Sequence, residues 1–202
     1  MKREIRTRMR RLLREIAAAE RQRLSLEVCR RMLGLPEWQR AETVMLFLAT
    51  PTEVDTAPLV EAGWRAGKRV LAPRVDPERN VMAAFEIRAW SDCLPGFKGI
   101  LEPVEQEAFD VPAIDLIVVP GLAFDLGGGR LGAGGGFYDR FLARDDCRAG
   151  TVGVAFELQV VEALPREPHD RGVESLVTDR AVRRFGADGE RGDRRSPALD
   201  RH

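Results

Sequence analysis

Residues 118–142 read VVPGLAFDLGGGRLGAGGGFYDRFL, and the rest of the chain can be interpreted outward from this stretch. It opens with the end of an apolar run, 114–119, that is typical of a buried strand. Glycines dominate 127–136, and 137–142 then resembles the first turns of a helix. Main chain without Cβ atoms can curl tightly around an anion, and a helix N-terminus adds unpaired N–H donors. The order of strand, glycine loop and helix therefore indicates a phosphate site, although clustered glycines more often form a plain surface loop.

Two charged residues lie in or beside the glycine-rich segment. Arg130 lies inside it, and a guanidinium can bind two phosphate oxygens at once. Asp139 follows the last glycine, where a carboxylate could hold a Mg²⁺ attached to the same phosphates. Known nucleotide motifs fit less well. Gly127, Gly129 and Gly132 match the dinucleotide fingerprint in spacing, but the strand ends several residues too early, and the Gly-Lys-Ser/Thr of a Walker loop is absent.

Composition predicts one domain and excludes several classes of function. The chain has 202 residues with 44% hydrophobic content, enough for one sizeable core. Lys+Arg and Asp+Glu both number 32, so the basic excess usual in nucleic-acid-binding proteins is missing. The 3 cysteines lack metal-ligand spacing and indicate reduced thiols in a cytoplasmic protein. We expect no membrane span or secretory signal, because no long apolar run occurs and the N-terminus is charged.

The expected elements predict an α/β protein, a single-domain sheet of mixed or mostly parallel strands flanked by helices. Helices are expected at 2–20, 24–33 and 57–67 and from 137 and 159 onward, and strands at 43–49, 68–72, 81–87, 114–119, 151–156 and 174–178. Pro and Gly predict a loop at 94–103, and Trp90 is expected in the core. The domain would span 1–185. The charged segment 186–202 is expected to be disordered.

The first expected helix has a crowded basic face. Its apolar residues recur at helical spacing and leave the arginines on the other side. Such charge runs are usually solvated. Lys2 and Arg6 nevertheless lie one turn apart, so both could reach the phosphates of a nucleotide.

The segment PGLAFDxxGxRLGxGGGFYDRFL at 120–142 resembles the hallmark of the 5-formyltetrahydrofolate cyclo-ligases, also called methenyltetrahydrofolate synthetases. The resemblance spans Lys2 to Thr178. Lys2-Arg3-Glu4-Ile5-Arg6 is similar to the family's KRxxR-like ATP element, and 94–103 to its GIxEP element. It implies conversion of 5-formyltetrahydrofolate to 5,10-methenyltetrahydrofolate with ATP and Mg²⁺, releasing ADP and phosphate. The expected partner is the folate substrate, which can carry a polyglutamate tail. The protein itself is expected to be a monomer.

The resemblance also implies site residues. Nucleotide contacts are implied at Lys2, Arg3, Arg6, Arg130, Leu131, Gly132, Gly134, Gly135, Gly136, Phe137 and Tyr138. Folate contacts are implied at Leu48, Glu53, Phe97, Ala133, Gly134, Gly135, Gly136 and Phe137. Arg130 and Lys2 would be catalytic, and Asp139 and Asp170 would contact Mg²⁺. From the residues alone, Glu53 could instead cap a helix and Phe97 could instead be a buried side chain that anchors its loop. His169 invites a general-base reading, but no Ser or Cys nucleophile motif accompanies it.

The implied reaction needs little covalent chemistry from side chains. A formamide oxygen leaves poorly, so phosphoryl transfer onto it makes phosphate the leaving group, and N10 then closes the ring. The protein positions two substrates and neutralises oxygen charge. Two alternatives stay open. One is a cyclo-ligase-like paralogue in another pathway, such as thiamine-related metabolism, because Ala133 stands where the family usually has Arg or Lys. The other is a non-catalytic nucleotide- or RNA-binding module that uses the arginine-rich helix.

Overall fold

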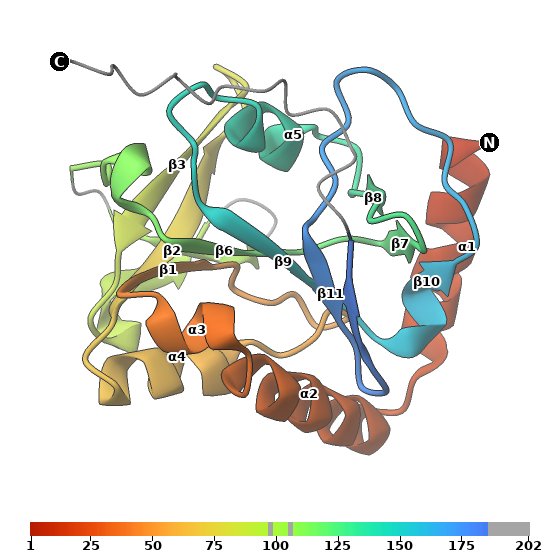
Figure 1. Ribbon diagram of the computed structural model, residues 1–202, viewed down its shortest axis with the longest axis horizontal. Coiled ribbons are helices and arrows are strands. Elements are labelled where there is room, and N and C mark those ends of the chain that lie inside the picture. Colours follow the sequence, from red (N-terminus) through yellow and green to blue (C-terminus); the bar gives the residue numbers. More distant parts are fainter. Residues whose placement is uncertain (97–98, 105–106, 186–202) are drawn as a thin grey trace, which may run out of the picture.

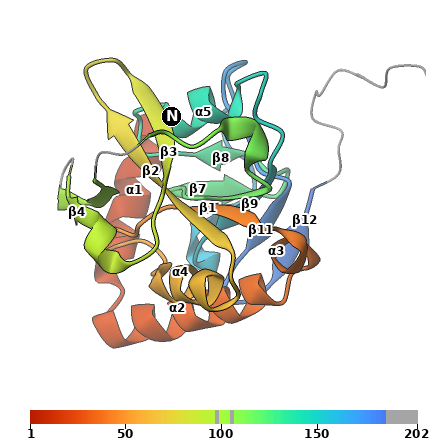
Figure 2. The same cartoon turned by 90° about the vertical axis from the view of Figure 1, so that its left-hand side faces the viewer.

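The computed structural model describes residues 1–96, 99–104 and 107–185. The predicted folate contact Phe97 and the predicted disordered segment 186–202 therefore lie outside the described residues. A sheet of seven strands runs through the molecule in the order β12-β11-β9-β6-β1-β2-β3 (Figures 1 and 2). Its strands are β1 Thr43–Leu46, β2 Arg69–Asp76, β3 Val81–Glu86, β6 Leu116–Val119, β9 Gly150–Val154, β11 Ser175–Val177 and β12 Val182–Arg184.

The five inner strands of this sheet are parallel, and the two edge strands are antiparallel to their neighbours. This arrangement confirms the predicted α/β fold with a mixed, mostly parallel sheet. Both faces of the inner strands are buried. Along β6, Leu116 and Val118 pack into one core cluster, while Ile117 and Val119 pack into another. A strand covered on both sides reads as a continuous apolar run, which is why 114–119 predicted it.

Helices cover the two faces unequally. α2 Ala18–Leu33, α3 Pro36–Arg40 and α4 Ala57–Arg65 lie on one face, and α5 Phe137–Leu142 lies on the other (Figures 1 and 2). α1 Lys2–Glu15 stands at the side, next to a three-stranded sheet in the order β10-β7-β8. Those strands are β7 Ala123–Asp125, β8 Arg130–Leu131 and β10 Val160–Val161. No helix within the described ranges is long and apolar enough to cross a membrane.

The predicted end of the first helix, at residue 20, is wrong, because α1 ends at Glu15. The chain bends at Ile16, whose φ and ψ of −70° and 119° are extended, and a new helix begins at Ala18. Arg21 Nη2 donates to the carbonyls of Leu13 and Ile16, at 3.1 and 2.7 Å, which satisfies the open end of α1. Local propensity favours one long helix here, but packing of Leu13 into the core overrides it.

Other local predictions are also corrected. Gln159 does not open a helix, because the 3-10 turn Glu157–Gln159 leads directly into β10. The expected loop at 94–103 contains the hairpin of β4 Cys93–Pro95 and β5 Leu101–Pro103. The strand at 174–178 is followed by a further one, β12. Trp90 is 37% exposed and packs edge-on against Trp64 instead of entering the core.

Candidate functional site

The glycines of the central stretch fall into two structurally different groups. Gly127, Gly128 and Gly129 form the turn between β7 and β8. This turn closes on the carboxylate of Asp125, which accepts from Gly127 N at 2.9 Å and from Gly129 N at 2.7 Å. Asp125 also accepts from Leu164 N and from Arg166. The N–H groups of Gly127 and Gly129 are therefore used within the protein and are not available to a ligand.

The second group, residues 132–136, leads from β8 into α5 and is here called the anion loop. Within the described residues, none of its N–H groups donates to another protein atom. Gly134 has φ of +115° and Gly136 has φ of +66°, conformations that side chains rarely adopt. Gly136 is also the N-cap residue of α5, so the open donors of the loop continue into those of the first helical turn.

Two arginines of α1 hold the carbonyl side of the anion loop. Arg6 Nε donates to Gly132 O and Arg10 Nη2 donates to Ala133 O, both at 2.9 Å. α1 is placed for these contacts because Met9, on its apolar face, packs with Leu131. The peptide bonds are trans, so each N–H points opposite to the preceding C=O. The N–H groups of Ala133 and Gly134 therefore point away from α1.

Arg130 ties the anion loop to a second loop near residue 170. Its side chain is only 3% exposed, and its Nη2 lies 2.6 Å from Asp139 Oδ1. The same carboxylate oxygen accepts from Arg171 N at 3.1 Å, while Arg130 Nε donates to Arg171 O at 3.4 Å. Asp139 is thus joined to Arg171, the residue that follows Asp170.

Lys2 is paired in a similar way. Its Nζ lies 2.6 Å from Asp170 Oδ2 and 3.2 Å from Glu167 Oε2. Burial raises the pKa of Asp170, but the hydrogen bonds from Lys2 and from Glu167 N outweigh it and hold this pKa below its ordinary value. Burial conversely lowers the pKa of Lys2, but the same two carboxylates outweigh this effect and raise it. Two of the predicted nucleotide cations, Lys2 and Arg130, are therefore ion-paired with the two predicted metal ligands.

A more apolar region surrounds Glu53 and Tyr138, and Tyr138 belongs to the first turn of α5. Glu53 follows β1 and its Oε2 accepts from Thr50 N at 2.8 Å, so it does not cap α4, where Asp55 accepts from Ala57 N instead. Burial raises the pKa of Glu53. The hydroxyl of Tyr138 is also buried, and burial together with the nearby Glu53 charge raises the pKa of this phenol. Both the carboxyl of Glu53 and the hydroxyl of Tyr138 are therefore buried away from water.

Comparison with known proteins bears directly on this arrangement. The model of the 5-formyltetrahydrofolate cyclo-ligase family matches residues 1–179. The chain belongs to this family. A 5-formyltetrahydrofolate cyclo-ligase of Escherichia coli K12 is 35% identical over 84% of this chain and 95% of its own length. The mouse 5-formyltetrahydrofolate cyclo-ligase is 30% identical over 87% of this chain and 92% of its own length.

Solved structures agree with this assignment. The Aquifex aeolicus 5,10-methenyltetrahydrofolate synthetase superimposes with a TM-score of 0.81 at 36% identity, covering 100% of this chain and 97% of that one. A Mycoplasma pneumoniae 5,10-methenyltetrahydrofolate synthetase, at 19% identity and a TM-score of 0.72, shares the fold. Family membership places the chain among ligases of folate metabolism.

Two of the predicted contact residues are buried apolar side chains. Leu131, a predicted nucleotide contact, is 3% exposed and packs with Met9 and Ala123. Leu48, a predicted folate contact, is 7% exposed and belongs to the core cluster that includes β1 residues. Both residues are apolar, lie in strand-like segments and pack in the hydrophobic core.

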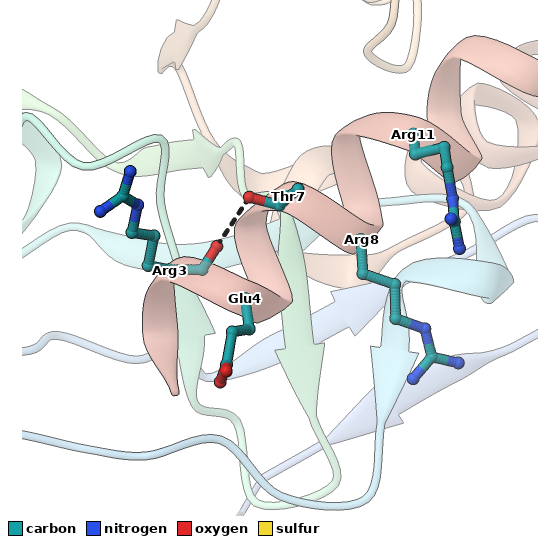
Figure 3. A pocket seen from close by; sticks show the side chains of 5 residues that line it. All are labelled: Arg3, Glu4, Thr7, Arg8 and Arg11. Carbon is teal, nitrogen blue, oxygen red and sulfur yellow. Dashed lines mark hydrogen bonds between the residues drawn. The ribbon is translucent and has the colours of Figure 1, made fainter.

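Arg3 lies apart from the anion loop. Its side chain lines a shallow hollow on the outer face of α1 together with Glu4, Thr7, Arg8 and Arg11 (Figure 3). Thr7 Oγ1 donates to Arg3 O at 3.0 Å, a bond within the helix. The residues that line this hollow all come from one helix. The contacts between α1 and the anion loop are made instead by Arg6 and Arg10.

Sequence reasoning missed four residues that shape the site: Arg10, Asp125, Glu167 and Arg171. Arg10 could have been found, because it follows Arg6 by one helical turn. Asp125 could also have been found, because Asp two residues before Gly is typical of an Asx turn. Glu167 and Arg171 act through contacts distant in sequence and give no local signal.

Proposed function

We propose that this chain catalyses the ATP- and Mg²⁺-dependent conversion of 5-formyltetrahydrofolate to 5,10-methenyltetrahydrofolate, with release of ADP and phosphate. The observation that carries the proposal is the anion loop. Its N–H groups have no acceptor within the described residues, Arg6 holds its Gly132 carbonyl, and the buried Arg130 leads into it from β8. A triphosphate would thus meet open N–H groups and arginines at the anion loop. An uncharged heterocycle would suit the buried surroundings of Glu53.

On the nucleotide side, phosphate oxygens would accept from the main-chain N–H groups of the anion loop and the first turn of α5. Lys2 and Arg6 would add positive charge from α1, and Arg130 would add it from β8. Leu131 and Gly132 would contribute main chain, and Phe137 and Tyr138 would follow in the helix. Arg3 stays a peripheral contact that a nucleotide base or ribose could reach from the edge of α1.

On the folate side, Glu53 would accept N–H donors of the pterin. The main chain of Ala133 to Gly136 and the Phe137 ring would lie between the two substrates. Arg140 stabilises this wall, since its guanidinium lies 5.1 Å from the centroid of the Phe137 ring and donates to Gly135 O at 2.9 Å. Leu48 would support the pocket from beneath, and Phe97 stays a predicted folate contact.

The donor set suits Mg²⁺. Asp139 and Asp170 each use one carboxylate oxygen for their ion pair, which leaves a second hard oxygen on each for a cation. Glu167, His169 and Asp170 also each offer a ligand atom within 4.8 Å of one another. When bound, Mg²⁺ would neutralise charge on the phosphate oxygens.

The protein's own part in the reaction is to position and to neutralise. Arg130 is held rigidly by Asp139 and by the carbonyl of Arg171, so it can balance charge on the transferred phosphoryl group without reorganising. Lys2 balances the same group from α1. Orientation of the formyl oxygen toward the phosphate, with water excluded by the pocket, would account for much of the rate.

The test is a coupled assay with matched variants. Purified protein should produce the absorbance of 5,10-methenyltetrahydrofolate from 5-formyltetrahydrofolate only when both ATP and Mg²⁺ are present. Arg6→Gln should raise KM for ATP roughly 10-fold, because a charge-assisted contact is lost. Arg11→Gln, on the outer face of α1, should leave it unchanged. Absence of product with wild-type protein would refute the proposal, and salt-dependent RNA binding unaffected by ATP would favour a binding module instead.

We further propose a cytoplasmic monomer whose folate substrate can carry a polyglutamate tail. Reduced thiols support the compartment. Burial, followed by the charge of Asp55, raises the pKa of the Cys29 thiol to about 12, so this cysteine behaves as a packed apolar side chain.

A further inference from the structure

Arg140 of α5 joins two segments that are far apart in the sequence. Its Nε donates to Asn80 O and its Nη2 donates to Gly135 O, both at 2.9 Å. Gly135 belongs to the anion loop, whereas Asn80 lies in the turn between β2 and β3, whose tip stands beside α5 (Figure 1). These two hydrogen bonds of Arg140 are here called the hairpin link, because they tie the β2–β3 hairpin to the anion loop.

The hairpin link completes a set of three arginines that hold carbonyls of the anion loop. Arg6 and Arg10 hold two of these carbonyls from α1, and Arg140 holds the carbonyl of Gly135 from α5. Because the peptide bonds are trans, the Gly136 N–H points away from the Arg140 guanidinium. Within the described residues this N–H donates to no protein atom. Arg140 therefore sets the direction of one open donor of the loop.

The hairpin gives Arg140 a fixed anchor. Asn80 has φ of 57°, the one positive φ among the described residues other than glycine, and asparagine tolerates this left-handed conformation better than most side chains. The turn before it is closed by Asp76, whose Oδ1 accepts from Glu78 N and Arg79 N, both at 3.0 Å. β3 pairs with β2 along its whole length. The position of the Asn80 carbonyl is thus set by the hairpin itself.

We propose that Arg140 is a positioning residue for the nucleotide, and that the tip of the β2–β3 hairpin, through the hairpin link, directs the Gly136 N–H at a phosphate oxygen. This inference rests on the proposed function, which places the phosphates at the anion loop. Neither Arg140 nor Asn80 has to touch the nucleotide. Loss of the link would let the peptide between Gly135 and Gly136 turn and would weaken nucleotide binding, while the reacting groups stay in place.

Arg140→Met removes the hairpin link and keeps a side chain of similar reach. KM for ATP should rise about 5-fold, the effect of one misdirected hydrogen bond, with kcat within about 2-fold of wild type. Arg140→Lys should recover only part of the loss, because an ammonium does not reproduce the fork geometry that binds both carbonyls. A purely structural role would lower the midpoint of urea unfolding and leave KM for ATP unchanged, and that result would overturn the inference.

Variants at Asn80 test the hairpin end of the link. Asn80→Val should raise KM for ATP about as much as Arg140→Met, because a β-branched residue resists a positive φ and displaces the tip. Asn80→Gly keeps both this conformation and the carbonyl, so it should raise KM less than about 2-fold. Arg79→Gln, in the same turn, is the matched control and should have the KM of wild type.

The double variant of Asn80→Val with Arg140→Met should be no worse than either single variant, because both changes break the same link. Losses that multiply would show that the two residues act independently and would overturn the inference. So would an Asn80→Val enzyme with the KM of its Arg79→Gln control.

A binding measurement separates this inference from the proposed reaction. Calorimetric titration with Mg·ATP should give a Kd about 5-fold higher than wild type in both Arg140→Met and Asn80→Val. If wild type makes no methenyl product but these Kd values rise, the reaction is refuted and the hairpin link stands. If product forms and neither Kd nor KM responds, the reaction stands and the role of the link is refuted. A wild-type protein that does not bind Mg·ATP would refute both.

Discussion

Two glycine triplets seven residues apart in one stretch differ in whether the protein supplies acceptors for their N–H groups. The triplet at 127–129 closes around a carboxylate of its own chain, so its turn is complete without a ligand. The triplet at 134–136 belongs to the anion loop, whose carbonyls are held by α1 and whose N–H groups are open. Glycine content is the same in both. What distinguishes a structural turn from an anion site is whether the protein supplies the acceptor.

The largest expected effect comes from Arg130, which lies between the two triplets. In the proposed reaction, Arg130→Met should lower turnover roughly 10²- to 10³-fold, because it would remove a preorganised charge near the transferred phosphoryl group. Arg130→Lys should recover a small part, since an ammonium cannot reproduce the paired contacts with Asp139 and Arg171. Initial rates at saturating substrates measure this, with circular dichroism as a control for folding. Turnover within about 3-fold of wild type would show that the anion loop acts without Arg130.

The next effect distinguishes the triplets by stability. At Gly128, where φ is +79°, a Cβ would lie 2.8 Å from Val173 O, so Gly128→Ala should lower the free energy of unfolding by about 3 kcal/mol. At Gly134 the nearest atom, in Arg6, is 3.8 Å away. Gly134→Ala should therefore cost only about 1 kcal/mol but raise KM for ATP. Urea unfolding and steady-state kinetics separate the two, and equal losses of stability would contradict the comparison.

Asp125 gives a pH-dependent test of the first triplet. Burial raises its pKa, but hydrogen bonds from Arg166, Gly129, Leu164 and Gly127 outweigh this effect and hold the pKa below 3.8. A depressed pKa means that the stabilisation is fully present above 3.8 and is lost as the pH falls through the lower folded value. Asp125→Asn should cost about 2 kcal/mol at neutral pH.

The difference in unfolding free energy between wild type and Asp125→Asn should therefore shrink as the solution is acidified below 3.8. Denaturant titrations at a series of pH values measure it. A difference that stays constant, or that grows in acid, would show that the charge of Asp125 does not hold this turn.

The smallest effect is expected at Arg10, which contacts only the carbonyl of Ala133 from an exposed position. Arg10→Gln should raise KM for ATP about 2- to 3-fold and leave stability within about 0.5 kcal/mol of wild type. Arg8→Gln on the outer face of α1 is the matched control. If Arg10→Gln and Arg8→Gln have the same KM for ATP, Arg10 does not help to position the anion loop.

The sequence predicted the elements whose signals are local. The apolar run before residue 120 predicts strand β6, and the glycines at 134–136 predict the loop that leads into α5. The prediction of a mixed, mostly parallel sheet is confirmed. Three features were not predictable in this way. The bend at Ile16 follows from tertiary packing, β7 and β8 are too short to show periodicity, and the ion pair of Lys2 with Asp170 joins residues 168 positions apart. The roles of the predicted site residues in binding stay predictions.

The outermost strand β12 has a further consequence for how the molecule behaves at high concentration. An edge strand presents unpaired backbone groups to which another chain could add. Here Arg183 and Arg184 lie on that border, and they are ion-paired with Glu157 and Glu37. Charged side chains on an edge discourage sheet extension, so colloidal stability should decline when concentrated salt screens this border.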